Sequence, residues 1–516
     1  MPDGRTGRTL KIASRAATAE IVRTARARRG HPGRHNDHDR QQRARAFRQT
    51  LETLGPLYIK VGQILATRPD IMPQYAIDEL EHLNDQANVA PFSMFEPVLE
   101  DELGAGWRSR FRAVHTDQPL GSASLAQVYK AIWADGTPCV IKVQRPGSEA
   151  AVRGDMAVLR KAAWLIAKTA PRFCEVVDVQ AMLETLFTVM DAELDFTREA
   201  RNMKRARKNA KQFKRLRIPK VLEATPRVLV QTFADGVPIN RIKSGDLTRK
   251  QRKEIAHQLM GYMFRGYFVD RFFHADPHPG NIIISPDGKA HLIDWGMLGR
   301  LDRGSSLAVL TCLLGITRSD GAALARGWAR LGTATPWSNM SAFVGDVSRI
   351  VPHWADASLA ELNYGVALMT LMRYSSERGI QISPLVSVLG KSLANMEGSV
   401  RYIYPKLKLD TALQSILQDI MRELLLDNLD VRQSSQVLLE CLAAVNGAPA
   451  QLQAFLSDLA DRQFAVQART NLGDPIGPGK RHRLSLHGNR IRAAAALVAA
   501  GVVLRRLQRR ATRSTE

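Results

Sequence analysis

Apolar residues recur at intervals of three and four along the chain from about residue 47 to residue 115. In the first half of this range they are Leu51, Leu54, Leu57, Tyr58, Val61, Ile64 and Leu65. Residues at this spacing share one face of a helix. We therefore predict a helical segment over 47–115, interrupted at Gly55-Pro56 because proline breaks a helix interior.

The pattern changes from helical to alternating near residue 118. A small-residue loop leads into an alternating run, the run breaks at Asp135-Gly136, and an apolar strand resumes at 139–144. Two such runs around an Asp-Gly dipeptide are typical of a β-hairpin. A further strand that ends in a turn is predicted for 227–236.

Helical spacing returns at 149–213 and from about 250 to 470, except for two short strands, IIIS and AHLID. A small mixed lobe followed by a helical lobe is the order of elements in a kinase-like fold. We predict an α+β, protein-kinase-like bilobal fold. Its parts are a basic, disordered arm at 1–46, a helical extension at 47–115, a mixed N-lobe at 116–236, a helical C-lobe at 237–470 and a basic tail at 471–516.

The composition is that of a folded chain, with 516 residues of which 45% are hydrophobic. This length fits two or three domains and the apolar content excludes general disorder. The four cysteines are far apart and form no C-x-x-C pair, which argues against a disulfide framework or a cysteine-ligated zinc. The arginine-rich start has no apolar core, so we expect no secretory signal and a reducing, cytoplasmic location.

The net charge of +23 is concentrated in three segments of the chain. Residues 1–48 and 480–516 each carry +9, and residues 201–220 hold ten basic residues and no acid, which leaves −5 for the rest. The basic segments lack interleaved aromatic residues and a nucleic-acid motif. Nucleic acid is therefore not an expected partner.

Two of the basic segments favour contact with an anionic membrane surface. In residues 201–220, Met203, Ala206, Ala210 and Phe213 share one helical face, and basic residues occupy the other faces. This pattern is typical of a helix on an anionic membrane, but a lobe helix with a solvated basic face is slightly favoured for this helix alone. Residues 493–504 are apolar, yet shorter than the ~20 residues of a membrane span. We expect them to lie in the interface or against the body.

Candidate chemistry centres on residues 273–284, FHADPHPGNIII. His274, Asp276 and His278 have the types of side chain that bind transition metals. However, two prolines stiffen this turn and no neighbouring His or Cys cluster completes a ligand set. A histidine-ligated metal is the less favoured interpretation, and packing or capping of the loop by the histidines is the alternative.

The same stretch also fits phosphoryl transfer. Asn281 stands five residues after Asp276, and Asp294 opens an Asp-Trp-Gly turn after an apolar strand. Kinases combine a catalytic Asp, an Asn five residues later and a D-x-G turn, and the Asn and second Asp hold Mg²⁺. Mg²⁺ prefers hard oxygen ligands, and nucleotide phosphates complete its shell. We predict that Asp276 is catalytic and that Asn281 and Asp294 are the metal ligands.

Phosphoryl transfer from a nucleotide also needs a lysine that neutralises the phosphates. Lys142 lies in the middle of a predicted strand, on the face opposite Ile141 and Val143. A lone strand lysine is usually solvated. Its position after a small-residue loop and before the Asp and Asn residues favours the phosphate role.

Four elements in this order resemble the UbiB-like family of atypical kinases, the AarF/ADCK group, over about residues 47–300. YIKVGQILATRPDIMP at 58–73 is similar to the family's K-x-G-Q element, and PLGSASLAQVYKA at 119–131 to its alanine-rich loop. ELDFTREARN at 193–202 is similar to its E-x-D element, and HADPHPGN with DWG to its catalytic and metal-binding elements.

This resemblance implies that Lys142 pairs with Glu199 and reaches the phosphates of ATP or ADP. It also implies that a cleft-covering group lies over the active site, formed by Lys60, Gly62 and Gln63 and anchored by Glu193 and Asp195. On spacing alone, Lys60, Gln63, Glu193 and Glu199 would be assigned to solvated helix faces. The other residues implied to contact the nucleotide are Gly121, Ser122, Ala123, Ser124, Leu125, Ala126 and Val128.

The alanine-rich loop has one glycine where ordinary kinases have three. Because alanine and serine have less backbone freedom than glycine, the nucleotide should be held differently. The resemblance accordingly implies an unusual nucleotide preference and suppressed protein phosphorylation. No Ala-Pro-Glu element follows Asp294, so a docking platform for peptides is not expected.

We expect an ATP- and Mg²⁺-dependent atypical kinase or ATPase that is peripherally associated with a membrane. By resemblance, it would support the biosynthesis of ubiquinone or another isoprenoid lipid, with biosynthetic enzymes as partners. Two alternatives stay open. One is a catalytically silent, nucleotide-binding scaffold for lipid-biosynthetic enzymes, and the other is a serine/threonine protein kinase.

Overall fold

The structure is a computed structural model that describes residues 37–66, 68, 72–83, 87–169, 179–243, 245–335, 337–355, 364–405 and 420. All of these except Ile420 belong to one compact unit, whose fold is given below. The predictions for the arm before residue 37, for the basic tail and for the apolar stretch at 493–504 lie outside the described residues.

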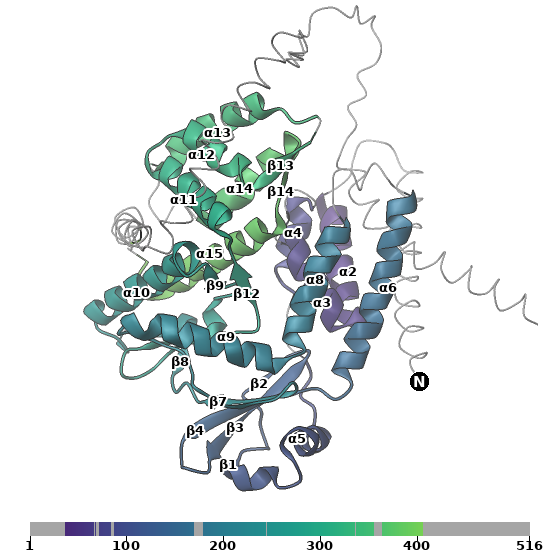
Figure 1. Cartoon of the computed structure of the whole chain (residues 1–516), viewed down its shortest axis with the longest axis vertical. Coiled ribbons are helices and arrows are strands. Elements are labelled where there is room, and N and C mark those ends of the chain that lie inside the picture. Colours follow the sequence, from purple (N-terminus) through teal and green to yellow (C-terminus); the bar gives the residue numbers. More distant parts are fainter. Residues whose placement is uncertain are drawn as a thin grey trace, which may run out of the picture. The chain divides into compact units, whose positions relative to one another are not determined.

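The predicted N-terminal extension forms α2 (Asp37–Leu54), α3 (Pro56–Ala66) and α4 (Gln74–Leu80). Gly55 separates the first two helices with a backbone φ of 110°, a conformation that favours glycine. These helices lie beside α6 (Ser148–Thr169) and α8 (Val179–Glu193), and the five helices share one apolar core (Figure 1). The extension is therefore packed on the rest of the unit.

The N-lobe is built on an antiparallel sheet in the order β1-β3-β4-β7-β6, with β2 paired to β3. Its strands are β1 (Phe111–Val114), β2 (Gly121–Ser122), β3 (Ala126–Trp133), β4 (Pro138–Gln144), β6 (Val221–Ala224) and β7 (Val228–Thr232). β3 and β4 are the predicted hairpin, and Gly136 turns between them with a φ of 92°.

The helical prediction for 47–115 is wrong at its C-terminal end. Helix α5 (Glu96–Leu103) and the short helices η1 (Phe92–Met94) and η2 (Trp107–Arg110) precede β1, which pairs with β3. The Phe111 ring meets the Trp133 ring edge-on, with 5.1 Å between ring centroids. Cross-strand pairing of large aromatic residues stabilises a strand here more than helical spacing could.

Helix α9 (Phe196–Asn209) and η3 (Ala210–Gln212) lie in sequence between α8 and the strands β6 and β7 of the N-lobe sheet. The predicted apolar face of this segment is turned into the protein, because Met203, Ala206 and Ala210 are buried. The basic residues on the other faces are exposed. The slightly favoured interpretation, a lobe helix with a solvated basic face, is therefore confirmed for the packing of this helix.

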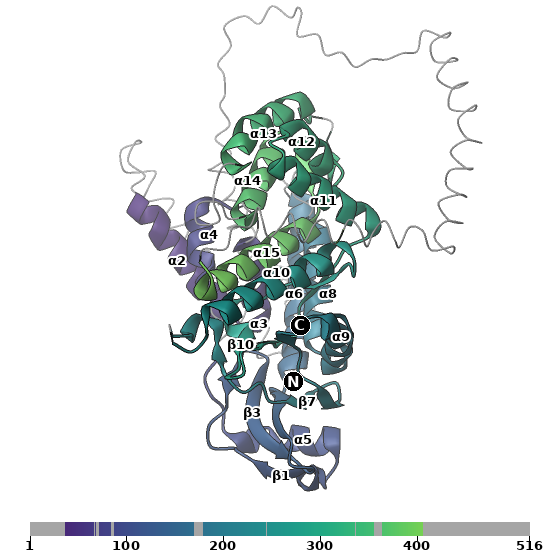
Figure 2. The same ribbon diagram turned by 90° about the vertical axis from the view of Figure 1, so that its left-hand side faces the viewer.

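The C-lobe is mainly helical. Its helices are η4 (Ile239–Arg241), α10 (Arg249–Phe268), η5 (Pro279–Asn281), α11 (Arg303–Thr317), α12 (Gly321–Ala329), α13 (Met340–Ala355), α14 (Tyr364–Glu377) and α15 (Pro384–Ile403). Figures 1 and 2 both show α15 beside α10. Packing on α10 holds α15 beside the loop that contains the candidate site residues.

Short strands form three small sheets in this lobe. The strands are β5 (Leu216–Arg217), β8 (Val237–Pro238), β9 (Phe272–His274), β10 (Ile282–Ile284), β11 (Ala290–Leu292), β12 (Leu298–Arg300), β13 (Gly332–Ala334) and β14 (Ile380–Ile382). β10 and β11 are the predicted short strands and pair with each other, while β12 pairs with β9. The architecture confirms the predicted α+β class with a mixed N-lobe and a helical C-lobe.

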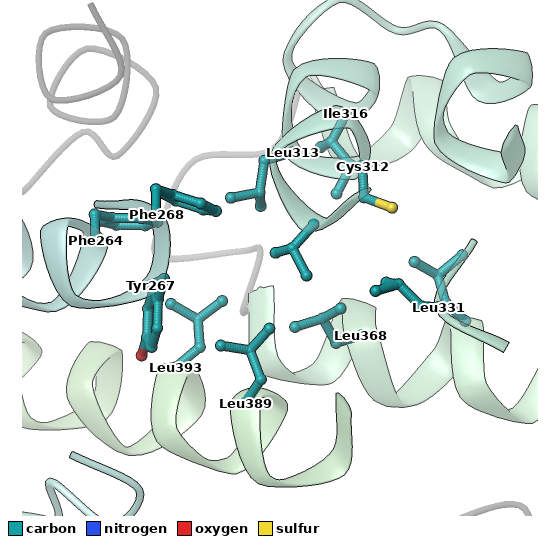
Figure 3. A pocket seen from close by; sticks show the side chains of 12 residues that line it. Phe264, Tyr267, Phe268, Cys312, Leu313, Ile316, Leu331, Leu368, Leu389 and Leu393 are labelled. Atoms are coloured by element: carbon teal, nitrogen blue, oxygen red, sulfur yellow. The ribbon is translucent and has the colours of Figure 1, made fainter. Parts of the chain in front are cut away.

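An apolar pocket lies in the C-lobe between α10, α11, α14 and α15 (Figure 3). Its lining includes Tyr267 of α10, Cys312 of α11, Leu368 of α14 and Leu389 of α15. Burial raises the pKa of the Cys312 thiol to about 12, so this thiol is not reactive. None of the described helices has the length and apolar character needed to cross a membrane.

Gly62 of the K-x-G-Q element is required by helix packing. A Cβ atom at this position would lie 2.2 Å from Leu83 Cδ1 and 2.7 Å from Leu51 Cδ1. We expect Gly62→Val to destabilise the protein by about 1–3 kcal/mol, because extra methyl groups overpack this core. The midpoint of urea denaturation measures the change.

Gly154→Val is the matched control, because Gly154 also lies in a helix but no atom would lie within 4 Å of its Cβ. Equal effects of the two substitutions would show that packing at Gly62 is not the cause.

Candidate active site

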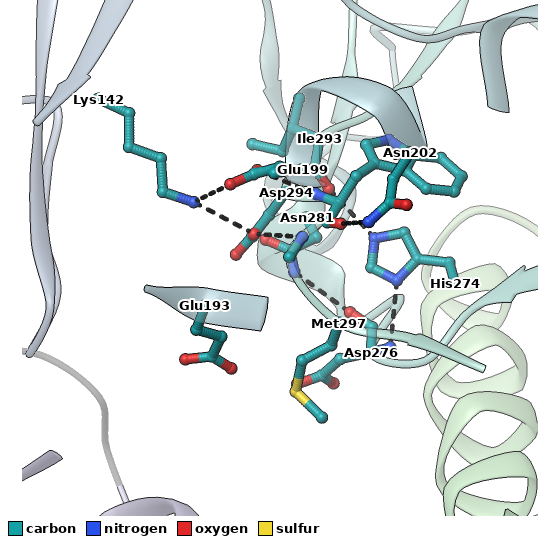
Figure 4. Close-up of polar contacts among 12 residues, drawn as sticks. Lys142, Glu193, Glu199, Asn202, His274, Asp276, Asn281, Ile293, Asp294 and Met297 are labelled. Atoms are coloured by element: carbon teal, nitrogen blue, oxygen red, sulfur yellow. Dashed lines mark hydrogen bonds and ion pairs between the residues drawn. The ribbon is translucent and has the colours of Figure 1, made fainter. Parts of the chain in front are cut away.

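The centre of the site is a group of three charged side chains from three elements (Figure 4). Lys142 lies in β4 between Val128 of β3 and Leu229 of β7. Its Nζ is 3.0 Å from Glu199 Oε2 and 3.4 Å from Asp294 Oδ1. The structure thus brings the predicted phosphate-binding lysine to its predicted glutamate partner and to the aspartate of the Asp-Trp-Gly turn.

Glu199 reaches Lys142 because α9 begins at Phe196, which places Glu199 in the first turn of the helix. Asp195 is the N-cap of α9, and its side chain accepts a hydrogen bond from the Thr197 backbone N–H at 3.0 Å. Glu199 is in the first turn, where the helix dipole favours a negative charge. Asp195 therefore starts α9. Its predicted role as an anchor for Lys60 and Gln63 stays a prediction.

Glu199 and Asn202 of α9 also hold the Asp-Trp-Gly turn. The Trp295 backbone N–H donates to Glu199 Oε1 at 3.1 Å, and Asn202 Nδ2 donates to the Trp295 carbonyl at 3.1 Å. The Trp295 ring is fully buried and stacks on Phe272. The backbone N–H and the carbonyl of Trp295 are thus both bonded to α9. The position of the preceding residue, Asp294, therefore depends on the position of this helix.

The backbone of Asp294 is in the left-handed region, with a φ of 59°. Aspartate and asparagine tolerate this conformation better than most residues other than glycine. Non-glycine residues in this region are concentrated at functional sites. This conformation places the carboxylate of Asp294 beside Lys142 while the next residue, Trp295, is buried.

The charges at this centre shift the pKa values of all three groups. Burial disfavours the ammonium form of Lys142, but the carboxylates of Asp294 and Glu199 outweigh burial and raise its pKa. The Lys142 charge holds the pKa of Asp294 well below its usual range. Burial raises the pKa of Glu199, with Lys142 opposing that rise. Lys142 and Asp294 are therefore charged at neutral pH.

Asp276 and Asn281 lie in one loop with His274. The Asn281 side-chain amide donates to the Asp276 carbonyl at 3.1 Å, and the Ile293 backbone N–H donates to the Asn281 carbonyl at 3.0 Å. These bonds hold the predicted catalytic loop beside the strand that leads to Asp294. The predicted catalytic residue and the two predicted metal ligands thus belong to one site.

The two histidines support the loop rather than form a metal centre. His274 is buried, and its Nδ1 accepts a hydrogen bond from the Asp276 N–H at 3.1 Å while its Nε2 lies 3.2 Å from the Ile293 carbonyl. His278 caps η5 by accepting from the Gly280 N–H at 3.1 Å. No group of three or more His, Cys, Asp or Glu suited to a metal occurs in the part of the chain that the structure describes.

Asp276 has two further partners that the sequence did not indicate. Lys391 Nζ lies 3.0 Å from Asp276 Oδ2, and Asn395 Nδ2 donates to Asp276 Oδ1 at 2.6 Å. Both residues belong to α15, far along the chain from the loop. Burial opposes ionisation of Asp276, but the charges of Lys391 and His278 outweigh it and lower the pKa of Asp276.

The K-x-G-Q lysine lies at the same site. Lys60 Nζ is 2.7 Å from Glu193 Oε1 and 3.3 Å from the sulfur of Met297. Lys60 therefore contacts the predicted E-x-D glutamate and the residue after the Asp-Trp-Gly turn. Gln63 is half-buried in the next turn of α3, whereas Gly62 faces the packing of α2 and α4.

The alanine-rich loop is clamped from the end of β4. Arg145 Nε donates to the Ala123 carbonyl at 2.8 Å, and its Nη2 donates to Ser122 Oγ at 2.7 Å. The buried Gln127 side chain ties the same loop to both backbone groups of Ala90. The predicted nucleotide-binding residues between Gly121 and Val128 thus lie in β2, in the start of β3 and in the loop between them. The bonds from Arg145 and Gln127 hold this loop in place.

The donor set suits Mg²⁺ held jointly with a nucleotide. The Asn281 amide oxygen and the Asp294 carboxylate are hard donors, and Mg²⁺ is typically bound by one or two such groups plus phosphates. The site's lysines are Lys60, Lys142 and Lys391, and its carboxylates are Glu193, Glu199, Asp276 and Asp294. Each of these lysines has a carboxylate partner, so the site carries no surplus of positive charge that would favour a bare anion over a cation.

Comparison with known proteins gives consistent matches. The family model described as ABC1 atypical kinase-like domain matches residues 82–327. An uncharacterized protein of Synechocystis is 32% identical over 364 residues, which are 68% of this chain and 88% of that protein. A protein of Azotobacter vinelandii named "Probable protein kinase UbiB" is 32% identical over 471 residues, which are 89% of this chain and 83% of that one.

Among solved structures, a Mycobacterium tuberculosis protein in complex with erythromycin is similar. It has a TM-score of 0.46 and 24% identity, and the match covers 67% of this chain and 91% of that one.

Glu199→Gln should destabilise the fold, because it leaves Lys142 without its buried partner. The loss of one member of a buried pair costs about 3 kcal/mol. The double variant Lys142→Met/Glu199→Gln should regain part of that loss, because no lysine is left without its buried partner and the carboxylate of Asp294, which loses Lys142, is half-exposed. Urea denaturation of the wild type, both single variants and the double variant measures the coupling, and additive effects would contradict the pairing.

Proposed function

Because the chain belongs to the UbiB-like family of ABC1 atypical kinases, we propose that it binds ATP with Mg²⁺ and transfers or hydrolyses the terminal phosphoryl group. The observation that carries this proposal is the assembly of Lys142, Glu199 and Asp294 at one centre. A lysine held by a helix glutamate beside the aspartate of a D-x-G turn is what phosphoryl transfer from ATP requires.

Each residue has a defined task in this proposal. Lys142 neutralises the phosphates, and Glu199 keeps its ammonium group in place. Asn281 and Asp294 would hold Mg²⁺, which on binding neutralises charge on the phosphates. Asp276 orients the O–H of the acceptor toward the phosphoryl group. The braced loop at 121–128 covers the nucleotide from the N-lobe.

The acceptor in this proposal is a small molecule, a lipid-derived molecule or water. Only residues 295–302 separate Asp294 from α11, and within them β12 pairs with β9. In protein kinases the longer segment after this turn carries the activation-loop site. Lys60 of α3 also reaches the site from the N-terminal extension. These contacts favour a small acceptor over a folded protein.

A nucleotide-binding scaffold without turnover is the second candidate. A serine/threonine protein kinase is the third, and the name "Probable protein kinase UbiB" of several relatives agrees with protein phosphorylation in general. From the family resemblance we propose that the reaction supports the biosynthesis of ubiquinone or another isoprenoid lipid, with biosynthetic enzymes as partners. A peripheral position at an anionic membrane fits the exposed basic face of α9, whose apolar face is packed into the protein.

Mg²⁺-dependent ATP turnover by purified protein, with and without anionic liposomes, tests the proposal. Asp294→Asn is the sharpest variant, because asparagine tolerates the same left-handed backbone while the charge is lost. We expect turnover by the wild type and a loss of at least about 100-fold in the variant.

The outcomes separate the candidates. ATP binding without turnover under any condition would support the scaffold, and phosphate transfer to a protein hydroxyl would support the protein kinase. Failure of the wild type to bind nucleotide would contradict all three.

The basic face of α9 provides a test of membrane association. Lys204, Lys208 and Lys211 are exposed and have no part in the site. Their triple replacement by Gln should weaken binding to vesicles of anionic lipid roughly 100-fold at low salt, since each basic residue adds to the attraction. Co-sedimentation with vesicles measures it.

The control for this test replaces three exposed lysines elsewhere, Lys161, Lys250 and Lys253, by Gln. Equal losses in both triple variants would show that net charge, and not the α9 face, attracts the protein.

A further inference from the structure

Helix α15 lies outside the matched family range and contacts the catalytic loop at several points. Besides the two contacts with the Asp276 carboxylate, Ser392 Oγ donates to the His274 carbonyl at 2.6 Å. Ser399 Oγ donates to the Pro277 carbonyl at 3.0 Å. The loop on both sides of Asp276 is therefore bonded to one helix.

The other side of α15 is fixed by apolar packing. Leu389 and Leu393 line the apolar pocket with Tyr267 of α10 (Figure 3). The Tyr267 hydroxyl lies 2.9 Å from Ser392 Oγ, so α10, α15 and the loop form one chain of buried hydrogen bonds. Because its apolar side is held in this way, α15 presents Lys391 and Asn395 to the loop in a fixed orientation.

The two donors act on different oxygens of one carboxylate. Lys391 contacts Oδ2 and Asn395 contacts Oδ1, which fixes the plane of the Asp276 carboxylate. A carboxylate can accept about four hydrogen bonds, so positions remain for an acceptor O–H. Lys60 adds a second positive charge near this carboxylate, and His274 and His278 flank it on the loop.

We propose that Lys391 and Asn395 of α15 are positioning residues that fix the carboxylate of Asp276 in the plane from which it orients the phosphoryl acceptor. This inference rests on the proposed phosphoryl-transfer function. It extends the functional site to a helix that begins more than fifty residues beyond the end of the matched family range at residue 327.

The decisive experiment compares kcat with KM for ATP in variants of the full-length protein. Lys391→Met keeps the length of the side chain but removes its charge and donor, and kcat should fall roughly 100-fold, as expected for a misplaced catalytic group. Asn395→Leu should lower kcat roughly tenfold through loss of one hydrogen bond to a charged group. KM for ATP should change little, because Lys142 and the loop at 121–128 are untouched.

Rescue separates positioning from general loss of structure. Lys391→Arg keeps a positive donor and should recover most of the lost kcat. Ser375→Ala is the structural control, because Ser375 is buried and its Oγ donates to the Met372 carbonyl at 2.9 Å within α14, a helix that carries none of the site residues. It should lower the denaturation midpoint without lowering kcat.

A stability cycle tests the contact without using turnover. Lys391→Met and Asp276→Asn should each destabilise the protein, because each leaves the other charge of the pair unpaired. The double variant removes both charges and should lose less than the sum. Additive losses, or an unchanged kcat in Lys391→Met when the wild type is active, would overturn this inference alone. A wild type that binds ATP but shows no turnover would instead overturn the proposed function and, with it, the catalytic role of these residues.

Discussion

The ion pair between the half-buried Lys142 and the buried Glu199 is the interaction on which the rest of the site depends. Lys142 is part of the N-lobe sheet, so its position is set by the neighbouring strands β3 and β7. Glu199 uses one oxygen for this lysine and the other for the backbone of Trp295. A single carboxylate thus joins the sheet to the Asp-Trp-Gly turn, and both must be in place for Asp294 to meet Lys142.

The charge balance of the site explains why its elements stay together. Each lysine comes from a different part of the fold: the N-terminal extension, the N-lobe sheet and the last described long helix. Each is paired with a carboxylate, because an unpaired buried charge would be strongly destabilising. With its lysines paired in this way, the site has no surplus of positive charge to repel Mg²⁺.

Much of the site was predictable because its residues stand in short, ordered motifs. Asp276, Asn281 and Asp294 lie within nineteen residues, and backbone pairing brings them together. The motifs did not reveal that Asp195 also caps α9 or that Gly62 packs against α2 and α4, since a helix cap and a packing contact depend on the folded chain. Lys391 and Asn395 were missed, although two polar residues spaced by four share one face of a helix, and polar groups that become buried need hydrogen-bond partners.

The sequence by itself determined the class of fold, the hairpin that carries Lys142 and the local Asp, Asn and Asp-Trp-Gly chemistry, because these depend on neighbours a few residues apart. Only the tertiary structure decided that α9 locks the Asp-Trp-Gly turn, that Arg145 clamps the alanine-rich loop and that α15 holds Asp276. These contacts join residues 22 to 115 positions apart. Contacts over such separations follow from how helices pack, which no local pattern records.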